Sequence, residues 1–147
     1  MRLSAKNRYG LAAMVLLAKE YGKGKVIAVN NIAENLSISK IYLEQIFSRF
    51  REARLVISQK GAQGGYYLSL PPKSVTVYDI FLAVDPALFE KTEDTVSAGA
   101  LNIEKAMRLT VFDQLEQILA ATLRRVTLEE VTQKAMEIGA DGYMYYL

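Results

Sequence analysis

Five side chains between residues 39 and 49 carry groups that could recognise DNA. They end in hydroxyl, ammonium, amide or guanidinium groups, at Ser39, Lys40, Tyr42, Gln45 and Arg49. An amide such as that of Gln45 can make two hydrogen bonds to adenine, and hydroxyl groups can bond bases or phosphates. Arg49 lies one helical turn further on, which favours a contact with the DNA backbone. For any one of these residues the alternative is an ordinary solvated helix face.

The elements around these residues predict a winged helix-turn-helix. Ser39 is a good N-cap for a helix that ends near Ala53, and apolar residues three or four apart mark its inner face, at Leu43, Ile46, Phe47 and Phe50. A helix over 29–36 precedes it, and two short strands over 55–59 and 66–70 follow. The second helix of such a unit is sized to enter a DNA major groove.

The turn between the two strands adds further candidate DNA contacts. Lys60 directly precedes a tip with three glycines in five residues, of which Gly64 and Gly65 allow close backbone approach. A cation on this tip could enter a narrow minor groove, where the potential is most negative. Lys6 and Arg8, at the start of the first helix, are candidates for flanking phosphates. The alternative is a glycine-rich hairpin with an incidental lysine.

The rest of the chain is predicted to be mainly helical. We expect helices over 4–21, 76–84, 102–126 and 127–138, a short strand at 26–27, and a mobile loop over 85–100. The fold class is therefore mainly α with a small β-hairpin wing. We divide the chain into a winged helix-turn-helix domain (1–84), a loop (85–100), and a dimerisation helix, short helix and aromatic tail (101–147).

The long helix carries an apolar stripe that needs a partner surface. Its members are spaced by one, three or four residues: Ile103, Met107, Val111, Leu115, Ile118, Leu119 and Leu123. Pairing with the same helix of a second subunit would cover this stripe and form a homodimer. Packing back onto its own domain is the alternative.

Charge and composition narrow the function classes. The net charge of +2 conceals a block over 1–60 with 11 basic and four acidic side chains, so +7, and a remainder of −5. A basic head favours a polyanionic partner. The chain has no cysteine and no histidine, which excludes disulfides, zinc fingers and cysteine-ligated iron–sulfur clusters. We expect no cofactor and no metal site. Without a membrane span or a secretory signal, the expected location is cytoplasmic.

Three segments resemble the IscR/NsrR/CymR family of bacterial winged-helix regulators: MRLSAKNRYGL, SISKIYLEQIFSRFREARLV and GAQGGYYL. The resemblance, which includes the long C-terminal helix, implies a DNA-binding homodimer, usually a repressor, on a palindromic operator. It places base-reading and wing contacts at Ser39, Tyr42, Gln45 and Lys60. Some members have a minor-groove arginine where this chain has Lys60, which keeps the charge without the flat guanidinium.

The resemblance also bears on how such a regulator is controlled. Many members hold an iron–sulfur cluster on three cysteines before the long helix, whereas residues 85–100 here contain none. The cysteine-free, CymR-like branch regulates cysteine and sulfur metabolism, and its implied partner is cysteine synthase, whose active site accepts a C-terminal aliphatic carboxylate. Tyr146 and Leu147 would be the docking residues, although the expected last residue is isoleucine. Alternatively, the tail covers the dimer core.

Three other functions compete with the repressor. One is a regulator of another pathway that senses a small molecule between the winged domain and the long helix. Another is a winged helix that binds proteins instead of DNA. An enzyme is disfavoured, because the adjacent carboxylates Glu93–Asp94 and Glu129–Glu130 point in different directions instead of converging on one site.

Overall fold

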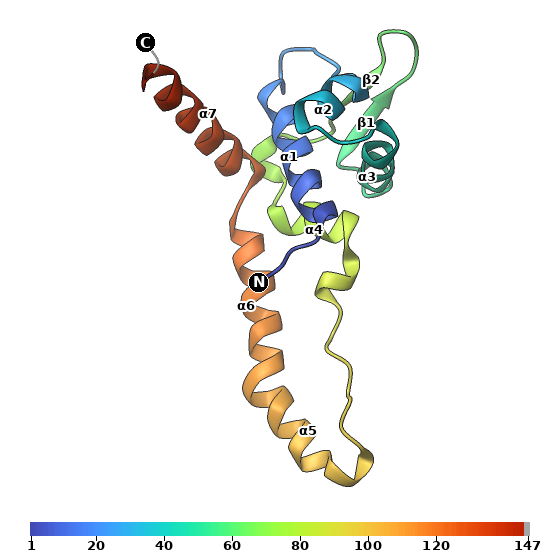
Figure 1. Ribbon diagram of the computed structural model, residues 1–147, viewed down its shortest axis with the longest axis vertical. Coiled ribbons are helices and arrows are strands. Elements are labelled where there is room, and N and C mark those ends of the chain that lie inside the picture. The colour runs from blue at the N-terminus through green and yellow to red at the C-terminus, as the bar shows by residue number, and fades with distance from the viewer. Residues whose placement is uncertain (146–147) are drawn as a thin grey trace.

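The computed structural model describes residues 1–145, in which a winged-helix head carries a long projecting helix and a last helix that leaves in another direction (Figure 1). The head contains α1 (Ala5–Lys19), α2 (Val29–Leu36), α3 (Lys40–Glu52), β1 (Val56–Gln59), β2 (Gly65–Leu68) and α4 (Val77–Val84). This arrangement confirms the predicted fold class. No helix in the described part of the chain is long and apolar enough to cross a membrane.

Side-chain caps fix where several helices begin. The hydroxyl of Ser39 accepts a hydrogen bond from the Tyr42 backbone N–H at 3.1 Å, so α3 starts where the sequence predicts. Thr76 and Asp79 form a complete capping box at the start of α4, with bonds of 2.9 and 3.1 Å. Between α2 and α3, Ser37 adopts a left-handed conformation with φ of 55°, which turns the chain from one helix into the next.

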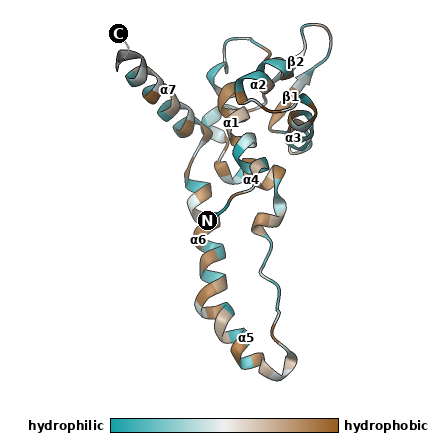
Figure 2. Ribbon diagram, in the orientation of Figure 1, coloured by the Kyte–Doolittle hydropathy of each residue, from teal (hydrophilic) through white to brown (hydrophobic). Residues whose placement is uncertain are grey.

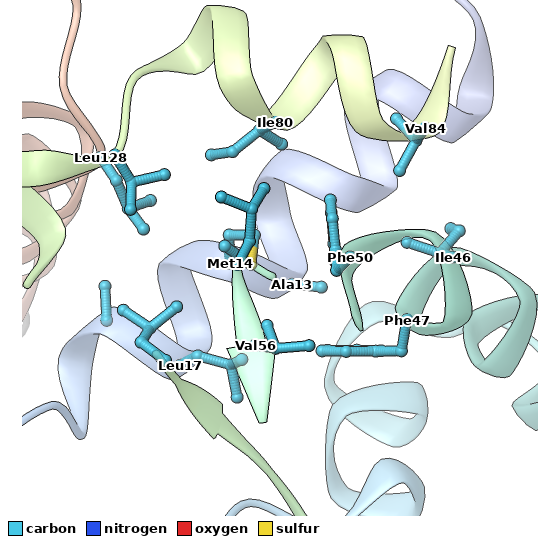
Figure 3. Close-up of a cluster of buried hydrophobic side chains, with 14 of the residues drawn as sticks. Ala13, Met14, Leu17, Ile46, Phe47, Phe50, Val56, Ile80, Val84 and Leu128 are labelled. Carbon is cyan, nitrogen blue, oxygen red and sulfur yellow. The ribbon is translucent and has the colours of Figure 1, made fainter. Parts of the chain in front are cut away.

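One apolar core joins every element of the head. Figure 3 shows side chains from α1, α3, β1 and α4 pointing toward one another, among them the fully buried Met14, Phe47 and Ile80. Leu128, from the start of the last helix, is also completely buried in this cluster. The C-terminal part of the chain therefore contributes to the core of the head.

The wing is a two-stranded antiparallel hairpin, with Val56 opposite Leu68 and Gln59 opposite Gly65. The short strand expected at Val26–Ile27 is reduced to one bridge, in which Ile27 and Tyr66 exchange two backbone hydrogen bonds of 2.9 Å. This bridge holds the base of the wing against the residues that precede α2.

The long helix spans α5 (Leu101–Met107), a π-helical turn (Arg108–Phe112) and α6 (Asp113–Arg125). Figure 2 shows hydrophobic positions along this projecting helix. The exposed apolar side chains on it are Leu101, Ile103, Leu109, Val111, Leu115 and Ile118. In the single chain, the apolar surface that the sequence predicts for contact with a partner is therefore exposed to solvent.

The segment over 85–100 is irregular but is bonded to the long helix. The Thr92 backbone N–H and hydroxyl donate to Glu116 Oε1 at 2.8 and 2.9 Å. The Arg108 guanidinium donates to Asp94 at 2.6 Å, and the Val96 N–H donates to Glu104 at 3.2 Å. The loop that the sequence predicts as mobile therefore has specific anchors along the helix.

The last helix, α7 (Leu128–Tyr145), begins as expected but is longer than the predicted end near Ile138. Thr127 caps it by accepting from the Glu130 N–H at 3.2 Å. Gly139 and Gly142 do not end the helix, because a glycine weakens a helix interior by only about 1 kcal/mol. Backbone bonds from Val77 to Val126 and from Leu128 to Val75 attach its start to the head.

Candidate nucleic-acid interface

The polar side of α3 presents its side chains to two separate hollows. The first, called here the helix hollow, lies between α3 and the start of α1 and has a volume of about 440 Å³. It is lined by Lys6, Tyr42, Gln45, Ile46, Ser48, Arg49, Glu52 and Val84. Four of the predicted contact residues thus come together, although Lys6 lies far from the others in sequence.

Tyr42 is partly buried in the helix hollow. Its ring meets the edge of the Tyr9 ring, with centroids 6.0 Å apart and planes at 85°. Burial, and then the neighbouring Tyr9, raise the pKa of the Tyr42 hydroxyl above its ordinary value. The hydroxyl therefore keeps its proton at neutral pH and can donate a hydrogen bond to a base or a phosphate.

Arg49 remains available for a ligand. Its guanidinium lies 3.7 Å from Glu52, and both side chains are 65% exposed. Exposed ion pairs of this kind contribute roughly 0–1 kcal/mol, so a phosphate could displace Glu52.

The second hollow, called here the wing hollow, lies between α3, the wing and the start of α2, and has a volume of about 420 Å³. Lys40 from α3 and Lys60 from the wing both line it. The structure therefore brings these two predicted cations to one concavity, on the other side of α3 from Arg49. Lys60 is exposed and directly follows the last residue of β1.

Sequence reasoning missed several polar residues of the wing hollow, among them Asn30, Glu44 and Arg51. Glu44 lies four residues after Lys40, and Arg51 lies seven after Glu44, which is the spacing of one helix face. That spacing could have identified the two α3 residues. A carboxylate in a major groove can accept from the amino group of cytosine. Glu44 therefore gives this face of α3 a hydrogen-bond acceptor in addition to its cations.

Gly64 and Gly65 are required by the shape of the wing. A Cβ atom on Gly64 would lie 2.2 Å from the Gln59 carbonyl oxygen, and one on Gly65 would lie 2.1 Å from the Ile27 carbonyl oxygen. These contacts within the chain account for both glycines, and a direct role in DNA contact stays a prediction. Arg8 lines a different surface, with Tyr9 and Leu36, between α1 and α2.

The seven residues predicted for a dimer interface fall into two groups. Ile103, Val111, Leu115 and Ile118 are each 44–61% exposed. Met107 and Leu119 are half-buried, and Leu123 packs against the core of the head. Leu123 therefore belongs at least partly to the chain's own core. Leu101 and Leu109, which the prediction omits, are exposed as well.

Residues 85–100, the segment in which many family members carry three cysteines, could not hold an iron–sulfur cluster. The chain supplies neither thiolate nor imidazole ligands. In the described residues, several polar groups of this region bond one another, with Arg108 between Asp94 and Asp113, although Glu104 Oε1 is buried without a hydrogen-bond partner. Among the same residues there is no group of three or more acidic, histidine or cysteine side chains that could hold a metal ion. The predicted docking residues Tyr146 and Leu147 lie outside the described residues.

Known proteins resemble this chain in both sequence and fold. CymR of Bacillus subtilis strain 168 is 33% identical over 149 aligned residues, which cover all of both chains. IscR of Klebsiella pneumoniae strain 342 is 32% identical over 142 residues, which cover 97% of this chain and 86% of IscR.

Two solved structures match at the level of the fold. The structure of B. subtilis CymR has a TM-score of 0.74 and 32% identity, and the match covers 91% of this chain and 98% of that one. The T. potens IscR structure has a TM-score of 0.67 and 34% identity, with 99% and 97% covered. These relatives are transcription regulators and not enzymes, as the sequence predicts. The family model of Rrf2, an iron-dependent transcriptional regulator, matches residues 3–134, and the chain therefore belongs to the Rrf2 family of transcription regulators.

Proposed function

We propose that this regulator is a homodimeric repressor that binds a roughly palindromic operator through α3 and the wing. The observation that carries this proposal is the pair of hollows flanking α3. They gather Lys6, Tyr42, Gln45 and Arg49 on one side, and Lys40 and Lys60 on the other. Both lie on a head whose residues 1–60 carry a net charge of +7. A convex helix between two cationic hollows suits a major groove bordered by phosphate backbones.

Each predicted contact then has a role. Ser39 at the N-cap of α3, with Tyr42 and Gln45 in its N-terminal half, would reach base edges, and Lys40 would contact bases or nearby phosphates. Arg49 and Lys6 would hold the backbone from the helix hollow, and Arg8 would reach a flanking phosphate. Lys60 would enter the adjacent minor groove, with Gly64 and Gly65 setting the path of the wing.

The exposed stripe on α5 and α6 supports the dimer. A second copy would cover the free apolar side chains, of which Val111, Leu115 and Ile118 recur at spacings of four and three residues. A twofold axis would then place two α3 helices on half-sites separated by multiples of about 34 Å.

One experiment tests DNA binding and the oligomeric state together. Genomic fragments bound by the purified protein should share a palindrome, and binding to it should weaken as salt rises. If six to ten phosphates are neutralised, affinity should fall about 10³–10⁵-fold between 50 and 200 mM salt. Light scattering should give twice the 16.4 kDa of one chain. An operator affinity that does not change with salt concentration would contradict the proposal.

We further propose cysteine and sulfur metabolism as the regulated pathway, with cysteine synthase as a partner. The support is the similarity to CymR, whose structure is described as that of the global cysteine regulator of B. subtilis. The absence of cysteine and histidine from this chain is consistent with a signal that does not pass through a cluster.

The tail provides the test of this partner. Deleting Tyr146 and Leu147 should abolish binding of cysteine synthase and leave the dimer intact. Leu147→Ile is the matched control, because it keeps an aliphatic carboxylate at the terminus, and it should bind at least as well as the wild type. Loss of the dimer on deletion would instead assign the tail to the dimer core.

A further inference from the structure

A pocket of small-molecule size lies beside the wing, separate from the helix hollow and sharing one wall residue with the wing hollow. This side pocket is open to solvent on one side, is lined by the end of α1, the turn over 20–27 and the hairpin, and has a volume of about 440 Å³. Its apolar lining comes from Leu17, Val26, Ile27 and Leu68, and it is flanked by Tyr21 and Tyr67, residues that are 44% and 37% exposed. Ligand pockets commonly measure about 300–1,000 Å³ and combine such apolar walls with a few polar groups.

The polar groups of the side pocket carry opposite charges. Glu20 and Lys25 both line it. Glu20 Oε2 is buried without a hydrogen-bond donor in the described residues. Its nearest cations are the Lys25 and Lys23 ammonium groups, at 3.5 and 3.6 Å. The Glu20 side chain is 28% exposed and, among the described residues, Oε2 is held only by these two long ion pairs, so a ligand that supplies an N–H at hydrogen-bond distance would be favoured there.

We propose that the side pocket binds an α-amino acid with an apolar side chain. The ligand's ammonium group would donate to Glu20, and its carboxylate would pair with Lys25. Its side chain would lie between Leu17, Tyr21 and Tyr67. The two charges beside one apolar cavity match the two charges and one apolar body of such a molecule.

The side pocket shares walls with the proposed DNA-binding surface. Gln59 lines both the side pocket and the wing hollow. Ile27, in the pocket wall, holds Tyr66 of the wing through two backbone bonds, and the next residue, Ala28, is the N-cap of α2. A ligand that moves residues 25–28 therefore moves the wing relative to α2. This regulatory consequence rests on the proposed function, whereas binding of the ligand does not.

Isothermal titration of the full-length protein tests the pocket. The probe is L-phenylalanine, compared with phenethylamine, which lacks the carboxylate, and 3-phenylpropionate, which lacks the ammonium group. L-Phenylalanine should bind saturably, and each analogue should bind about tenfold more weakly, since one charge-assisted contact is lost. L-Leucine serves as a second, aliphatic probe. Absence of saturable binding by both amino acids would overturn the proposal.

Three single substitutions, at Glu20, Lys25 and Lys23, test whether the amino acid binds in this pocket. Glu20→Gln and Lys25→Gln should each weaken L-phenylalanine binding about tenfold. Lys23→Gln is the matched control, because Lys23 also pairs with Glu20 but does not line the pocket. If Lys25→Gln binds as tightly as the wild type, the pocket is wrongly assigned, and this variant keeps the test decisive should Glu20→Gln fold poorly.

DNA binding is measured separately, so that the two proposals can fail independently. L-Phenylalanine at a concentration near its wild-type Kd should change operator affinity in the wild type and have a much smaller effect in Lys25→Gln at the same concentration. Salt-dependent operator binding without amino-acid binding would overturn the pocket alone. Amino-acid binding without operator binding would overturn the proposed function alone.

Discussion

Phe47 of α3 and Tyr66 of β2 stack with their ring centroids 4.4 Å apart and their planes at 20°. Phe47 is fully buried, and it also meets the edge of Phe50 at 5.7 Å. Because α3 and the wing are the two elements proposed to contact DNA, this stack joins them directly. The angle between them is therefore fixed in the core of the head.

Truncation of this stack should lower both stability and DNA affinity. Phe47→Ala should reduce the free energy of unfolding by about 3–5 kcal/mol, as for other buried aromatic residues. Tyr66→Ala should cost less stability but should weaken operator binding through the displaced wing. Tyr67→Ala, the next residue on β2 and on its other face, is the control. Urea denaturation and fluorescence anisotropy measure the two effects, and equal DNA affinity in the Tyr66 and Tyr67 variants would contradict this role.

Gly65→Ala should disrupt the wing. The new Cβ would lie 2.1 Å from the Ile27 carbonyl oxygen, which is itself bonded to the Tyr66 N–H. The bridge at the base of the wing must then break or shift. Gly139→Ala offers a contrast, because a Cβ there meets no atom within 4 Å and the residue lies inside α7. It should stabilise the protein by about 0.4–1 kcal/mol. Thermal unfolding distinguishes the two, and a stabilised Gly65 variant would refute the argument.

Gln45 and Arg49 should differ in what they contribute to DNA binding. Gln45→Ala should cost about 1–3 kcal/mol and relax discrimination at one base pair. Arg49→Ala should weaken binding to all sequences alike and reduce the salt slope by about 1. Affinities for a set of single-base operator variants, measured at several salt concentrations, test both. Unchanged discrimination in Gln45→Ala would remove this residue from base recognition.

A charge in the exposed stripe should dissociate the proposed dimer. Leu115→Asp would place a carboxylate among side chains that are 44–61% exposed and would be desolvated by a partner. Leu82→Asp is the control, since Leu82 of α4 is 41% exposed but lies on the head. Light scattering should show a monomer only for the first variant. If both variants stay dimeric, the interface lies elsewhere.

The anchors of the 85–100 segment should weaken in acid. Hydrogen bonding and charge from Arg108 lower the pKa of Asp94 below its ordinary 3.8, and bonds from Thr92 lower that of Glu116 below 4.5. Since both folded values are depressed, these anchors persist above the ordinary values and are lost as pH falls through the folded ones. NMR titration of the carboxyl carbons should show both low midpoints. Arg108→Ala should raise that of Asp94 toward 3.8, and an unchanged midpoint would exclude the ion pair.

Local sequence signals located most of the head. Ser39 and Thr76 begin helices because their hydroxyl groups cap backbone N–H groups only three residues away, a relationship that sequence spacing shows directly. The apolar periodicity of α3 likewise predicts its buried face, Leu43, Ile46, Phe47 and Phe50. The sequence predicts the end of α7 too early. Gly139 and Gly142 favour an end there, but the helix-forming residues around them outweigh that preference and the helix continues to Tyr145.

The sequence by itself determined the order of the elements, the basic head and the exclusion of thiolate and imidazole chemistry, since these follow from local patterns and composition. Only the tertiary structure decided which residues meet. It divided the α3 contacts between two hollows, packed Leu123 against the head's core and joined Thr92 to Glu116 by hydrogen bonds. It also placed Glu20 and Lys25 beside one apolar pocket. Such contacts depend on how the helices and the wing pack against one another. This packing brings together residues that are far apart in the sequence, and no local sequence pattern indicates that they will meet.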